Sequence, residues 1–139
     1  MDKHDLQQLL EEAEHYVDLA MASLLTRKQR EQIVGASRTG FRHELELQEK
    51  LRATLLVNYL FPVVDSEDRE ILSAMVFVSE QIRMGCAVEA SAFPPRGKKI
   101  FEKAMADLES VYMRGEAHIR AMELTPTQRA IIGRLMTIA

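Results

Sequence analysis

The sequence predicts an all-α protein, a single-domain bundle of four main helices followed by a short C-terminal helix. Apolar residues recur three and four positions apart over long stretches, which is the spacing of amphipathic helices. No stretch shows the strict alternation of a strand between hairpin turns. The strong breaks are few, at Pro62, at the double proline Pro94–Pro95 and before Pro126. A chain of 139 residues also fits one domain.

The first two helices are expected at residues 3–24 and 27–61. One apolar stripe defines the first helix: Leu6, Leu9, Leu10, Ala13, Val17, Ala20 and Leu24. Thr26 offers an N-cap for the second, which must end by Phe61 because Pro62 disfavours helical geometry in the residue before it. Gly35 and Gly40 each cost about 1 kcal/mol relative to alanine inside a helix, so a break in the second helix stays open.

The remaining helices are expected at residues 66–91, 97–122 and 126–138. Asp65 and Ser66 precede an acidic first turn, which complements the helix dipole. The third helix is apolar on more than one face and should be the most buried element: its apolar residues are Ile71, Leu72, Met75, Val76, Phe77, Val78, Ile82, Met84 and Val88. Thr125 and Pro126 form an N-cap with proline at the first helical position, which opens the last helix.

A basic island follows an acidic N-terminal segment. Only Glu31 opposes its five cations, which are Arg27, Lys28, Arg30, Arg38 and Arg42. On one straight helix, Arg27, Arg38 and Arg42 would share a sector of roughly 60°, where guanidinium groups can bind phosphates or carboxylates in bidentate fashion. The alternative, which we favour, is a solvated helix edge that pairs with the acidic first helix. The net charge of −3 is too small to decide the partner class.

The island could also belong to a helix-turn-helix, with the turn at Ser37–Gly40 and a reading helix from Phe41 onward. Three carboxylates, of Glu44, Glu46 and Glu49, would then lie on or beside the surface that faces DNA. Phosphates repel carboxylates, so the match to this motif is poor.

A second basic cluster follows the double proline and consists of Arg96, Lys98 and Lys99, with Lys103 nearby. These cations lie at the N-terminal end of the predicted fourth helix, where the helix dipole disfavours positive charge unless an anion is bound. The cluster is therefore a second candidate for anion or partner binding. The favoured alternative is a solvated loop, since proline-rich connections are commonly exposed.

No catalytic motif is present, so an enzyme is the less favoured interpretation, and we expect no cofactor. Cys86 has no His or Lys near it in sequence and should serve as a small buried apolar residue. Glu12 and His15 have the spacing used in di-iron bundles, but no second pair of this kind exists. We therefore expect both to be solvent-exposed, and predict no metal site.

These patterns favour a non-catalytic interaction or regulatory protein that binds a macromolecular partner, preferably a protein, and self-associates, with a dimer favoured. The short last helix must bury its apolar face on something, which motivates self-association. A nucleic-acid-associated regulator that uses the arginine-rich edge is the alternative, followed by a ligand- or metal-binding bundle. The single cysteine and the lack of an apolar run of about 18 residues predict a cytoplasmic protein without a membrane partner.

Overall fold

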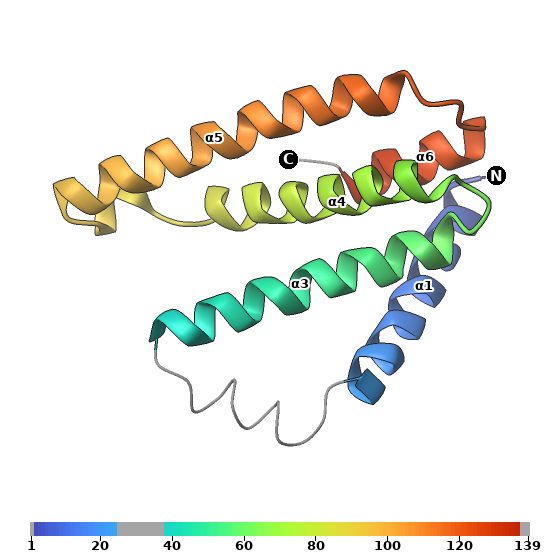
Figure 1. Ribbon diagram of the computed structural model, residues 1–139, viewed down its shortest axis with the longest axis horizontal. Coiled ribbons are helices and arrows are strands. Elements are labelled where there is room, and N and C mark those ends of the chain that lie inside the picture. Colours follow the sequence, from blue (N-terminus) through green and yellow to red (C-terminus); the bar gives the residue numbers. More distant parts are fainter. Residues whose placement is uncertain (1, 25–37, 137–139) are drawn as a thin grey trace. The chain divides into compact units, whose positions relative to one another are not determined.

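The computed structural model describes residues 2–24 and 38–136, with side chains of the second range described from residue 46 onward. Every regular element in these ranges is helical (Figure 1). The elements are α1 (Lys3–Leu24), α3 (Arg38–Leu60), α4 (Ser66–Cys86), the short 3₁₀ helix η1 (Ala90–Ala92), α5 (Pro95–Arg120) and α6 (Pro126–Leu135). The all-α prediction is thus confirmed.

The predicted helix boundaries hold closely at most ends. The helix predicted to run to residue 91 instead ends at Cys86, and η1 follows it. The fourth helix begins at Pro95 rather than at residue 97, because proline fits the first turn, where no intrahelical amide bond is required. Gly40 lies inside α3, so the turn of the helix-turn-helix alternative is not formed at residues 38–40. Residues 27–37 and 137–138 of the predicted helices lie outside the described residues.

The chain divides into two compact units, residues 1–73 and 74–139, with α4 contributing to both. In the first unit α1 packs along α3. Its buried apolar residues are Leu6, Ala13 and Val17 of α1, Ala53, Leu56 and Val57 of α3, and Phe61 and Leu72. At the surface of this unit the Arg52 guanidinium pairs with the Asp18 carboxylate. The rings of Tyr16 and Tyr59 stack with centroids 4.8 Å apart.

Helix α4 is the most buried helix among the described elements, as the sequence predicts. Its buried residues are Leu72, Ser73, Met75, Val76, Val78, Ser79 and Ile82. The Ser79 hydroxyl has no hydrogen-bond partner among the described residues. Apart from Ser73 and Ser79, the buried residues of this helix are apolar.

In the second unit, α4 and α5 run antiparallel and form the α4–α5 hairpin, residues 74–120 (Figure 1). Two reciprocal contacts join the helices. Met75 of α4 lies where a Cβ of Gly115 would be, and Met105 of α5 lies where a Cβ of Gly85 would be. Each helix thus offers one methionine and one glycine, ten residues apart in both. Because interiors are close-packed, these two contacts fix the register of the hairpin.

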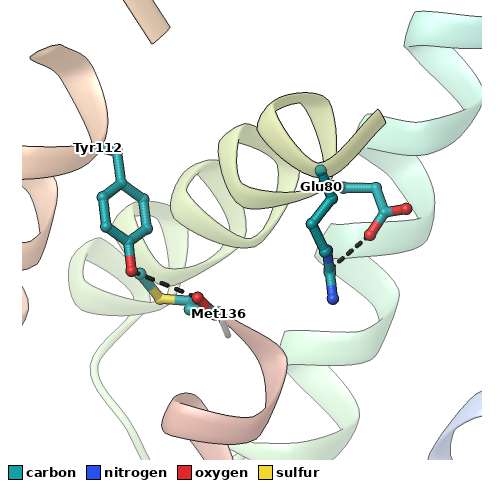
Figure 2. Close-up of polar contacts among 4 residues, drawn as sticks. Glu80, Tyr112 and Met136 are labelled. Carbon is teal, nitrogen blue, oxygen red and sulfur yellow. Dashed lines mark hydrogen bonds and ion pairs between the residues drawn. The ribbon is translucent and has the colours of Figure 1, made fainter. Parts of the chain in front are cut away.

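Helix α6 is held to the second unit by polar and apolar contacts. Thr125 and Gln128 form a capping box at its N-terminus, which confirms the predicted cap. The Arg129 guanidinium donates a hydrogen bond to the Met122 carbonyl at 2.6 Å. The Tyr112 hydroxyl donates to the Met136 carbonyl at 3.3 Å (Figure 2).

The apolar residues of the C-terminal helical segment, Ile131, Ile132 and Met136, are already buried within the chain. A second subunit is therefore not needed to cover the last helix. The reason that the sequence offered for self-association does not hold, and a dimer stays a prediction.

Candidate interaction surface

The basic island can be placed only in part. Arg27, Lys28 and Arg30 lie outside the described residues. Arg38 and Arg42 belong to the first turns of α3, four positions apart and so on one side of the helix, but their side chains also lie outside the described part of the chain. Both interpretations of the island therefore stay predictions.

The second basic cluster is fully described. Arg96, Lys98 and Lys99 are all exposed in the first two turns of α5. Arg96 and Lys99 are three positions apart and share one side of the helix, whereas Lys98 lies about 200° around the axis from Arg96. The structure thus separates Lys98 from the other two residues of the cluster.

Two further cations lie on the side of Arg96 and Lys99. Lys103 follows Lys99 by four positions, and Arg114 follows Arg96 by eighteen, which is five full turns. All four side chains are exposed, and we call them the α5 basic face. The sequence analysis missed Arg114, although the eighteen-residue spacing on one helix was a usable signal.

The α5 basic face has no internal charge partner in the described part of the chain. Ion pairs in that part join Asp18 to Arg52, Glu80 to Arg83 (Figure 2) and Glu116 to Arg120, and none of these three involves this face. The arginines elsewhere with described side chains all have a partner, whereas Arg96 and Arg114 have none: the partnered ones are Arg52, Arg69, Arg83, Arg120, Arg129 and Arg134. The four cations are therefore open to an external anion.

Large apolar side chains are exposed around the connection between α4 and α5. The exposed fractions are 47% for Met84, 43% for Val88, 38% for Phe93 and 63% for Ile100. We call these four residues, together with Arg96, Lys98 and Lys99, the hairpin end. The ring of Phe93 contacts that of Phe101, with centroids 5.4 Å apart. Residues 84–101 carry three cations, Arg96, Lys98 and Lys99, and one carboxylate, Glu89, so positive charge prevails in this segment.

Met84 and Val88 were counted among the apolar residues of the predicted third helix, and the structure leaves both of them exposed. Helix α4 ends at Cys86, so Val88 lies beyond the helix to which it was assigned. Met84 lies in the last turn, where α4 leaves it about half exposed. A helix end cannot be placed from apolar periodicity alone, which is why the hairpin end was not foreseen.

The residues considered for other chemistry are exposed. Cys86 is an exposed free thiol, which contradicts the expectation of a buried residue, because it is the last residue of α4. Glu12 and His15 are exposed on α1, as expected. In residues 2–24 and 46–136, no three or more His, Cys, Asp or Glu side chains are arranged to hold a metal ion.

Two findings concern membrane-spanning helices and similarity to known proteins. Of the helices that the structure describes, none combines the length and apolar character needed to cross a bilayer. No protein-family model, curated protein or solved structure matches the chain.

Proposed function

We propose that this protein is a non-catalytic, cytoplasmic interaction protein whose hairpin end binds a protein partner. The observation that carries the proposal is the exposure of Met84, Val88, Phe93 and Ile100 around one helix connection. Exposed apolar side chains gathered at one place commonly mark interaction surfaces. Aromatic residues, methionine and arginine are also the residue types enriched at the cores of protein interfaces.

The charges at the hairpin end define the partner's chemistry. Arg96, Lys98 and Lys99 lie in the same segment as the apolar residues, and Glu89 is the one carboxylate between residues 84 and 101. The complementary partner surface is an apolar patch bordered by Asp or Glu side chains. Salt should weaken this complex only modestly, because burial of apolar surface is not screened.

Site-specific photocrosslinking tests the proposal in the cells that produce the protein. A benzophenone amino acid replaces Phe93 in one variant and Met113 in a matched control. Both side chains are exposed, and Met113 lies on α5, outside the hairpin end. We expect an adduct with a distinct protein from position 93 and none from position 113. Val88→Ser with Ile100→Ser should reduce the adduct, since these changes remove apolar contacts without altering charge. Equal labelling from both positions, or none from position 93, would contradict the proposal.

Self-association remains part of the proposed function and has its own test. Sedimentation equilibrium of the full chain measures its mass directly, at low and at high salt. We expect a mass above that of one chain, with a dimer favoured. A mass of one chain, 15.8 kDa, across the accessible concentration range would remove self-association and leave the partner at the hairpin end unaffected.

A further inference from the structure

The α5 basic face has the geometry of a linear anion-binding surface. Arg96, Lys99, Lys103 and Arg114 occupy a sector of roughly 60° and extend along about 27 Å of the helix, at 1.5 Å per residue. Duplex DNA presents one phosphate per strand about every 3.4 Å along its axis, so a row of cations of this length can meet several phosphates. The dimensions therefore suit an extended anion.

The composition of this sector disfavours a folded protein as the ligand. The other residues within this sector or about 20° beside it are Ala106, Asp107, Ser110 and Ala117, all exposed, and the nearest large apolar side chains, Ile100 and Met113, lie about 40° outside it. An interface with a folded protein would lack an apolar core, and each exposed ion pair contributes only about 0–1 kcal/mol. A polyanion gains affinity from cations alone, because bound cations release its condensed counterions.

The position of the face gives a second argument. Arg96 and Lys99 lie near the N-terminus of α5, where the dipole disfavours cations by about 0.3–1 kcal/mol each. No ion pair in the described part of the chain offsets this cost. A bound anion does offset it, because both the helix N-terminus and the cations attract negative charge.

We propose that the α5 basic face binds the phosphate backbone of duplex nucleic acid without sequence preference. The four cations contact phosphates along the duplex, and Asp107 is the one carboxylate within or beside the sector. Phosphate contacts of this kind position a protein on a duplex but do not read its sequence. The proposal is independent of the hairpin-end partner, although Arg96 and Lys99 belong to both surfaces.

Fluorescence anisotropy of the full chain with labelled duplex DNA of random sequence tests this inference. Four phosphate contacts predict a log–log salt slope of about −3.6, which is a roughly hundredfold loss of affinity between 50 and 200 mM salt. Lys99→Gln with Lys103→Gln should reduce the magnitude of the slope by about 1.8. Lys3→Gln with Lys98→Gln makes the same charge change at residues that are not part of the α5 basic face and should leave the slope nearly unchanged.

Three results would overturn the inference. One is the absence of binding at 50 mM salt, and another is an equal effect of the two double variants, which would indicate attraction by overall charge. The third is binding to polyglutamate as tight as to DNA, which would make an acidic protein the ligand. Circular dichroism confirms that each variant keeps its helices. Val88→Ser with Ile100→Ser should leave DNA binding intact. Each of the two proposals, the protein partner at the hairpin end and the duplex on the α5 basic face, can therefore be refuted without the other.

Discussion

The two units of this protein hold their helices together in different ways. In the first unit, α1 and α3 contribute buried apolar residues that include Val17 and Val57, and the Asp18–Arg52 pair and the Tyr16–Tyr59 stack add contacts at the surface. In the second unit, α4 and α5 meet through methionine side chains set against glycines. Exposed pairs contribute little energy, whereas close-packed contacts tolerate little change. The methionine–glycine contacts of the hairpin should therefore be more sensitive to substitution than the surface pairs of the first unit.

The largest effect is expected from filling a glycine of the hairpin. Gly115→Val places side-chain atoms where Met75 lies, and Met75 is only 3% exposed, so it has little room to move. Overpacking of this kind should lower the free energy of unfolding by about 1–3 kcal/mol. Urea unfolding followed by circular dichroism measures the change.

Two variants sharpen this test. Met75→Ala combined with Gly115→Val should cost less than the sum of the single changes, because the first vacates the space that the second fills. Gly85→Val should cost less than Gly115→Val, since Met105 is only half-buried and can turn toward solvent. Additive effects of Met75→Ala and Gly115→Val would show that the two residues do not share one space.

A smaller effect, dependent on pH, is expected at Tyr112. Tyr112→Phe removes the hydrogen bond to the Met136 carbonyl and should cost about 1 kcal/mol at neutral pH. Burial raises the pKa of Tyr112, the Glu116 carboxylate raises it further, and Arg120 acts in the opposite direction. The folded state therefore favours the neutral phenol.

The sign of the pH dependence follows from that raised pKa. The stabilisation from Tyr112 is complete below the pKa of an unfolded tyrosine, about 10, and is lost as the pH rises through the folded value. Urea unfolding between pH 8 and 11 should show the advantage of the original chain over Tyr112→Phe shrinking above about pH 10. An advantage that stays constant, or grows, over this range would contradict the burial of the hydroxyl.

The smallest effect is expected in the first unit. A double-mutant cycle with Asp18→Asn and Arg52→Gln should give a coupling of about 1 kcal/mol or less, because both side chains are exposed. The coupling should fall further in 1 M salt, where the Debye length is about 3 Å. A coupling above about 2 kcal/mol would break the contrast between the two units.

The fold could be predicted where the determining signal is local. Apolar spacing placed α1 at its observed bounds, and the residues Thr125 and Pro126 placed the start of α6. Caps and amphipathic faces are properties of one segment, so a single sequence carries them. The exposure of Cys86 was not foreseen because it depends on where α4 ends, which local periodicity defines poorly.

The rest depends on residues far apart in the chain. No local sequence signal indicates that Met75 contacts Gly115. Local propensity also does not explain why a glycine occupies a position inside a helix, where other residues are favoured. The α5 basic face likewise contains residues that the sequence identified and one that it did not. The sequence identified Arg96 and Lys99, whereas Arg114 joined them only once α5 proved continuous from Pro95 to Arg120.

The reciprocal methionine–glycine contacts also bear on how this protein can evolve. Insertions or deletions in residues 87–94 change the length of the connection but not the ten-residue intervals within the helices. A single deletion between Met75 and Gly85 would shift one contact relative to the other and mismatch the hairpin. Homologues should therefore vary freely in connection length, keep the intervals within both helices, and accept a larger residue at position 115 only with a smaller one at position 75.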